Sequence, residues 1–222
     1  MWNGIDVGGR CVIVRLRDGT LWVHSPVALD DSLRGALAAL GPVRHIVAPN
    51  FEHVKYAAQW LSAYPEARGY GCPGLRAAMP QLGLHADARD ERTGAPPPEW
   101  GDSEFELVWL DAERNPFTGK PFFNELLFLH RGSRTALVTD FWWNYPSGLP
   151  LGSLAWKFGM DVVYGPFYDA FMVKDRAAHA RCARQVASWD IDTLAPCHGG
   201  MLRGAAARNA LLAQFGAAGE LA

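Results

Sequence analysis

The stretch Arg44-His45-Ile46-Val47-Ala48-Pro49-Asn50-Phe51-Glu52-His53 decides how the chain is expected to fold. The apolar run 46–48 predicts a buried strand that the next two residues end, and residues 54–61 predict a helix. In α/β proteins, ligands bind at the exits of buried strands. Glu52 and His53 lie at such an exit, so the stretch predicts a functional site.

Two later segments repeat this pattern of an apolar run that ends in a residue able to bind metal. Residues 135–139 run into Asp140, and residues 194–197 run into His198. Together with His53, these residues offer two imidazoles and one carboxylate from three separate strand ends. Such a set predicts a metal centre, although its spacing along the chain is too wide to form a self-sufficient motif.

Two imidazoles and one or two carboxylates suit zinc, iron or manganese, and the sequence does not choose among these ions. Glu52 or Glu125 would supply a fourth ligand, and a catalytic site keeps at least one position open. The three proposed ligands from the strand ends each also have a purely structural interpretation. His53 would begin a helix, Asp140 would cap a turn, and His198 would be fixed by the two glycines after it.

Composition excludes several classes of protein. Of the 222 residues, 49% are hydrophobic and 20% are charged, which is ordinary for a globular protein, and we expect one domain over residues 1–222. The net charge of −2 and the scattered Lys and Arg argue against a nucleic-acid partner. No apolar run approaches the roughly 20 residues that cross a bilayer, and no basic-then-apolar leader is present. We therefore expect a cytoplasmic protein without a membrane partner.

The four cysteines form no C-x-x-C pair and no dense disulfide pattern, so we expect them to be reduced core residues. Cys197, next to His198, has two interpretations. It is either a nucleophile or, as we favour, a small packing residue at a strand end.

The order of predicted elements indicates an α/β (α+β) protein. Asp18-Gly19 predicts a hairpin between strands 11–16 and 20–24. Residues 84–102, rich in proline and charge, predict a surface excursion. Further strands are expected at 69–72, 105–110, 125–129, 135–139 and 191–195, and further helices at 33–40, 73–79, 174–189 and 202–215. Strands in two antiparallel groups, with helices covering their outer faces, predict a four-layer αββα sandwich.

Aromatic residues are dense from Phe141 to Phe171. They predict either a core layer over a sheet or the wall of an apolar pocket beside the polar cluster. In the second interpretation, Trp142, Trp143 and Phe51 form that pocket.

With these residues in view, the chain resembles the metallo-β-lactamase superfamily, and most closely a domain-of-unknown-function branch of it with a reduced metal site. The superfamily's first motif, H-x-H-x-D-H, aligns with Ala48-Pro49-Asn50-Phe51-Glu52-His53. Two histidines are thus replaced, the aspartate becomes glutamate, and the last histidine is kept. The bridging aspartate matches Asp140 and the final histidine matches His198. The G-H-T-P-G motif has no counterpart, and near its place Asn124-Glu125 precedes a strand, as in that branch.

The resemblance implies that the residues of one metal position are lost and those of the other are kept. It therefore implies at most one divalent ion, with zinc favoured over iron or manganese. Glutamate is longer than aspartate, so the geometry at Glu52 need not match that of the superfamily.

Three functions remain open at this stage. The first is a single-metal hydrolase of an unknown small molecule, with His53, Asp140 and His198 as ligands, Glu52 as ligand or general base, and Glu125 orienting water or acting as acid. The second is an inactive binding module that keeps the fold without metal. The third is iron-dependent redox chemistry, which nothing in the sequence singles out. The substrate and oligomeric state are not specified.

Overall fold

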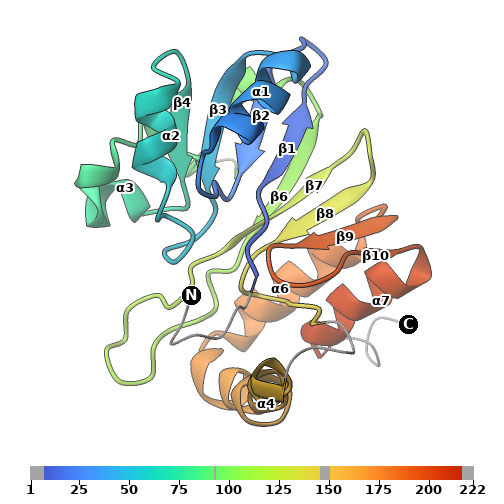
Figure 1. Cartoon of the computed structure of the whole chain (residues 1–222). Coiled ribbons are helices and arrows are strands. Elements are labelled where there is room, and N and C mark those ends of the chain that lie inside the picture. The colour runs from blue at the N-terminus through green and yellow to red at the C-terminus, as the bar shows by residue number, and fades with distance from the viewer. Residues whose placement is uncertain (1–7, 93, 146–150, 217–222) are drawn as a thin grey trace.

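The computed structural model describes residues 8–92, 94–145 and 151–216, and it contains two five-stranded sheets packed face to face (Figure 1). The first sheet has the order β1-β2-β3-β4-β5. Its strands are Val12–Arg15, Leu21–His24, Val43–Ala48, Arg68–Gly71 and Ala86–Asp87. β1 and β2 form the predicted antiparallel hairpin, whereas β2, β3, β4 and β5 are parallel.

The second sheet has the order β10-β9-β8-β7-β6. Its strands, in chain order, are Phe105–Trp109, Leu126–His130, Thr135–Val138, Thr193–Pro196 and Leu202–Arg203. The pairs are antiparallel except for β8 and β9, which are parallel.

Helices cover the outer faces of both sheets (Figure 1). On the first sheet lie α1 (Asp31–Leu40), α2 (Ala57–Ala63) and α3 (Leu75–Ala78), with the 3₁₀ turns η1 (Pro80–Leu82) and η2 (Pro98–Trp100) nearby in sequence. On the second lie α6 (Arg176–Ala187) and α7 (Ala205–Gln214). A continuous helical segment precedes them, composed of α4 (Leu151–Gly159), η3 (Met160–Tyr164), α5 (Gly165–Phe167) and η4 (Tyr168–Met172).

Three hydrophobic cores separate the four layers. β7 shows why, because successive side chains of a strand point to opposite faces of its sheet. Leu126 and Phe128 pack in the central core between the sheets, whereas Leu127 and Leu129 pack in the core beneath α6 and α7. The third core lies between the first sheet and α1 and α2. The predicted αββα sandwich is confirmed.

Several local predictions were wrong. The first sheet is mainly parallel rather than antiparallel, because β3, β4 and β5 are joined by crossover segments. Residues 84–102 are more than a surface excursion, since they supply the edge strand β5 and the fully buried Trp100. The helix expected at 54–61 begins at Ala57, and the one expected at 202–215 begins at Ala205, because Leu202 and Arg203 pair with β9.

Candidate metal centre

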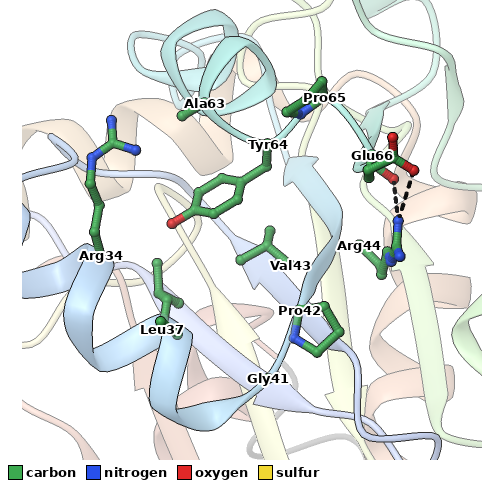
Figure 2. Close-up of a pocket in the computed structure, with 11 residues that line it drawn as sticks. Arg34, Leu37, Gly41, Pro42, Val43, Arg44, Ala63, Tyr64, Pro65 and Glu66 are labelled. Carbon is green, nitrogen blue, oxygen red and sulfur yellow. Dashed lines mark hydrogen bonds and ion pairs between the residues drawn. The ribbon is translucent and has the colours of Figure 1, made fainter.

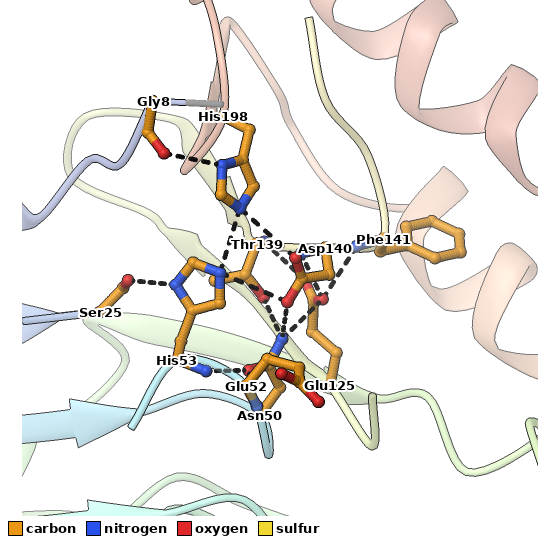
Figure 3. A network of polar contacts seen from close by, with 10 residues as sticks. All are labelled: Gly8, Ser25, Asn50, Glu52, His53, Glu125, Thr139, Asp140, Phe141 and His198. Carbon is orange, nitrogen blue, oxygen red and sulfur yellow. Dashed lines mark hydrogen bonds and ion pairs between the residues drawn. The ribbon is translucent and has the colours of Figure 1, made fainter. Parts of the chain in front are cut away.

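His53, Asp140 and His198 meet at one point, although 145 residues separate the first from the last (Figure 3). The two Nε2 atoms are 3.2 Å apart. The His53 Nε2 lies 3.3 Å from Asp140 Oδ2, and the His198 Nε2 lies 3.4 Å from Asp140 Oδ1. All three side chains are only 14% exposed. The structure therefore brings together the three residues that the sequence selected as ligands.

Strand register explains how Asp140 and His198 come together. β8 and β9 are parallel neighbours in which Val138 pairs with Pro196. Asp140 and His198 each lie two residues beyond that pair, so both side chains leave the sheet at the same level. Parallel strands place their carboxyl ends at one edge of a sheet, which is the usual place for a ligand site.

His53 reaches the site from the other sheet, through the turn that follows β3. The Oδ1 atom of Asn50 accepts hydrogen bonds from the backbone N–H groups of Glu52 at 3.0 Å and His53 at 2.8 Å. This side-chain cap fixes the turn and thus the direction of the His53 ring.

Each histidine has a partner on its outer nitrogen. The His198 Nδ1 lies 3.2 Å from the carbonyl oxygen of Gly8. A carbonyl only accepts, so this Nδ1 carries the proton and the Nε2 lone pair faces the site. The His53 Nδ1 lies 2.6 Å from the Oγ of Ser25. Such outer partners orient imidazole ligands in metal sites.

Ser25 holds an unusual backbone conformation, because its φ is +54° although it is not glycine. It follows β2 directly, is buried, and donates its backbone N–H to Val47. A buried non-glycine residue in this region is strained unless its surroundings fix it. The sequence does not reveal the role of Ser25 or Asn50 at this site, because neither side chain is a usual ligand and their partners are distant in sequence.

Glu125 lies next to the triad but does not face the cavity. It is fully buried just before β7, and its two oxygens accept the backbone N–H groups of Thr139 at 2.6 Å, Asp140 at 2.8 Å and Phe141 at 2.9 Å. Burial and the neighbouring charge of Asp140 raise the pKa of Glu125, and the N–H donors oppose that rise. The structure thus places Glu125 as the anchor of the Asp140 loop, not as the acid or water-orienting group predicted from the sequence.

Asp140 itself stays ionised. Burial alone would raise the pKa of its carboxyl, but hydrogen bonds and charge from His198 and His53 hold the pKa well below its usual range. A carboxylate next to two imidazoles is the protonation state that metal binding requires.

Glu52 lies outside the triad. Its side chain is exposed and lines the same cavity as His53, but its carboxylate does not join the group of ligand atoms that lie within 4.8 Å of one another. The fourth ligand expected from the sequence is therefore not in place, and its role as a base remains a prediction.

A cavity of about 490 Å³ opens beside the triad. The predicted aromatic wall is partly correct. Trp143 lines the cavity, whereas Trp142 packs on the core beneath α6 and Phe51 packs on the central core. Tyr145 and Tyr164, which also line the cavity, belong to the predicted aromatic segment, whereas the sequence missed Tyr56, Phe122 and Phe123. Trp156, in the same predicted segment, has a side chain outside the described residues.

Cys197 is not a nucleophile in this arrangement. Its side chain is buried, and burial raises the pKa of its thiol far above the usual value. This matches the packing interpretation of the sequence.

A second cavity, of about 430 Å³, lies between α1 and the end of α2 (Figure 2). It borders the start of β3, whereas the triad lies beyond the end of that strand. Its lining includes Arg34, Tyr64 and the ion pair between Arg44 and Glu66, at 3.3 Å, but no histidine or cysteine. The cavity therefore has no donor set for a transition metal.

The triad fits a divalent metal ion. Around a tetrahedral zinc with bonds of 2.0–2.1 Å, ligand atoms are spaced about 3.3 Å apart. The two Nε2 atoms lie 3.2 Å apart, and they lie 3.3 Å (His53, to Oδ2) and 3.4 Å (His198, to Oδ1) from the Asp140 carboxylate, close to that spacing. Two nitrogens and one carboxylate oxygen, each with an outer partner or anchor, also form a suitable donor set. Within the described residues, no other group of three such donors converges in this way.

Comparison with known proteins supports this fold. Residues 3–151 match the family model "Domain of unknown function (DUF4336)". The chain belongs to the DUF4336 family. No curated protein sequence matches this DUF4336 chain.

Solved structures show the metallo-β-lactamase fold for the DUF4336 chain. The mono-zinc form of the metallo-β-lactamase FIM-1 from Pseudomonas aeruginosa has a TM-score of 0.54 and 15% identity over 98% of this chain and 88% of the other. The chemotaxis sensor ODP, solved with a peroxy diiron species, has a TM-score of 0.58 and 14% identity, over 99% of this chain and 90% of the sensor chain. The flavodiiron protein from Giardia intestinalis has a TM-score of 0.60 and 10% identity, over 94% of this chain and 51% of the flavodiiron chain.

These identities are low, so the comparisons establish the fold but not an activity. The DUF4336 chain also spans about half the length of the flavodiiron proteins that it matches. No helix among its described residues is both long and apolar enough to cross a membrane.

Proposed function

We propose that this chain is a metal-dependent hydrolase that uses one divalent ion, held by His53, Asp140 and His198. The observation that carries the proposal is the convergence of two imidazole nitrogens, 3.2 Å apart, on the Asp140 carboxylate, with His53 3.3 Å from its Oδ2 and His198 3.4 Å from its Oδ1. Three such ligands leave one position of a tetrahedral ion for a reactant. When bound, such an ion supplies Lewis-acid chemistry and lowers the pKa of water toward about 7. Zinc is the favoured ion, with iron or manganese as alternatives.

The remaining groups would bind and orient a small molecule. The aromatic wall of the cavity would bury an apolar part of the substrate, with Trp143 and Tyr164 in ring contact at 5.9 Å. Glu52 and Lys55 are the exposed charged residues on this lining next to His53. In this proposal, Glu52 accepts a proton during hydrolysis, and Glu125 keeps the loop of Asp140 in position.

A panel of esters, lactones, thioesters and phosphodiesters, each with small and large apolar groups, tests the proposal. We expect the zinc-loaded protein to hydrolyse at least one class, with a preference for apolar groups. The His53→Ala variant should be inactive, whereas His85→Ala, which changes an exposed histidine outside the site, should remain active. A metal-loaded, folded protein that hydrolyses no member of the panel would contradict the proposal.

A second candidate is a binding module that needs no metal. One observation favours it: the triad atoms already contact each other, and the His53–His198 distance of 3.2 Å suits a hydrogen bond between the rings. Unpaired buried polar groups cost roughly 1–3 kcal/mol each, so such a network would persist without catalysis. In this case, the protein would take up no ion, and the cavity would bind an apolar small molecule without converting it.

A further inference from the structure

Behind the triad, three oxygen atoms converge on one nitrogen. The Nδ2 of Asn50 lies 2.6 Å from Asp140 Oδ2, 2.9 Å from Thr139 Oγ1 and 3.4 Å from Glu125 Oε2 (Figure 3). Asn50, Glu125 and Thr139 are fully buried. Two carboxylates and a hydroxyl directed at a common point form the oxygen-rich surroundings that hard divalent cations occupy in proteins.

The contacts of Asn50 determine which end of its amide faces these oxygens. Its Oδ1 accepts two backbone N–H groups, those of Glu52 and His53, and a carbonyl oxygen cannot donate. The NH₂ group must therefore face the acceptors. It is a neutral donor with two hydrogens, so it serves the two nearer oxygens, Asp140 Oδ2 and Thr139 Oγ1, without bringing a charge.

We infer that the Asn50 amide takes the place of a second cation and limits the site to one metal ion. Asp140 Oδ2 donates no lone pair to a second ion, because the Asn50 NH₂ group already lies against it at 2.6 Å. Oδ2 also lies 3.3 Å from the His53 Nε2, so the part of the carboxylate left for an ion is the one that faces His53 and His198 across the cavity. This inference rests on the proposed metal site, but not on hydrolysis.

The substitution Asn50→Asp isolates this role of the amide. Aspartate is nearly isosteric, and one of its oxygens would still accept the backbone N–H groups of Glu52 and His53. Its other oxygen would replace the NH₂ group and face Asp140 and Glu125. Three carboxylates at such distances cannot all remain ionised without a cation or a shared proton. The inference predicts that the variant binds a second ion, of the oxygen-preferring kind.

Counting ions per chain tests the inference. Wild type and Asn50→Asp are equilibrated with excess Zn²⁺ and Mn²⁺, desalted and submitted to elemental analysis, and their thermal midpoints are measured with and without Mn²⁺. We expect one ion per chain in the wild type and two in Asn50→Asp. Addition of Mn²⁺ to the zinc-loaded proteins, whose triad is already filled, should raise the midpoint only in the variant.

Asn115→Asp is the matched control. The Oδ1 of Asn115 also accepts two backbone N–H groups, those of Phe117 and Thr118, but in an exposed loop. This variant should keep one ion and the wild-type response to Mn²⁺.

The possible outcomes separate the inference from the proposed function. Two ions in the wild type would overturn the inference even if Asn50→Asp could not be purified. The same ion count in Asn50→Asp and wild type, with no effect of Mn²⁺ on the midpoint, would also overturn it. A wild type without any ion would contradict the proposed function and the metal site on which the inference rests. One ion in the wild type and two in Asn50→Asp, without hydrolysis of any member of the panel, would support the inference and contradict only the hydrolase.

Discussion

The two oxygens of Asp140 face unlike surroundings. On one side, Oδ1 faces the His198 imidazole and the cavity. On the other, Oδ2 lies 3.3 Å from the His53 Nε2 but also contacts the buried Asn50 amide, behind which the Glu125 carboxylate accepts three backbone N–H groups. The open side consists of groups that need a cation or protons, whereas the closed side is satisfied by permanent neutral donors. The Asp140 carboxylate thus belongs both to the candidate metal centre and to the buried network that supports it.

The largest effect on stability should come from the closed side. Glu125→Ala would leave three buried N–H groups unpaired, at about 1–3 kcal/mol each, so we expect a loss of more than about 3 kcal/mol in unfolding free energy by urea titration. Glu106→Ala removes a carboxylate from a surface ion pair with Arg131 and should cost less than about 1 kcal/mol. Similar losses in the two variants would contradict the anchoring role of Glu125.

A second buried glutamate, Glu113, sharpens this comparison, because burial outweighs its hydrogen bonds. Burial raises the pKa of Glu113 to about 7, although its carboxylate accepts the backbone N–H of Asn124 at 2.5 Å and a hydrogen bond from the Tyr168 hydroxyl. The folded chain therefore binds a proton more tightly than the unfolded chain, and stability should fall as pH rises from about 4.5 to about 7, by up to about 3 kcal/mol. Urea unfolding at pH 5 and pH 7.5 measures the fall. Glu113→Gln should lose much less stability over this range. An equal pH dependence in the wild type and in Glu113→Gln would show that Glu113 does not cause the fall.

On the open side, changes should affect metal affinity more than folding. Ser25→Ala removes the hydroxyl that contacts the His53 Nδ1, and we expect zinc affinity to fall about tenfold in competition with a chromophoric chelator. Ser25→Gly removes the same hydroxyl but accepts the φ of +54° without strain. It should show the same loss of affinity without loss of stability. Wild-type affinity in both variants would show that Ser25 does not position His53.

The smallest expected effect concerns the cavity wall. Trp143 lines the cavity and Trp142, its neighbour, packs on the core. Trp143→Ala should weaken the binding of an apolar fluorescent dye by about fivefold with little change in stability, since it removes apolar contact area. Trp142→Ala should instead lower the thermal midpoint. A reversed pattern would mean that the dye binds elsewhere or that the wall is misassigned.

The sequence predicted the parts of this arrangement that depend on local pattern. His53, Asp140 and His198 each follow an apolar strand, and their convergence follows from the strand ends of a layered fold. Glu125 was selected for its chemistry, but sequence alone does not show whether a carboxylate faces a cavity or three N–H groups. Asn50 and Ser25 act through contacts with residues up to 90 positions away, so no local pattern reveals them. The parallel order of β3, β4 and β5 was missed because short buried strands look alike in either orientation.

Elemental analysis of the protein, purified without chelator or added metal, tests the central claim most directly. We expect about one zinc, iron or manganese ion per chain in the wild type and in His85→Ala, and none in His198→Ala. An absence of metal from all three proteins, even after incubation with these ions, would contradict the metal centre and leave the cavity as a binding site without metal.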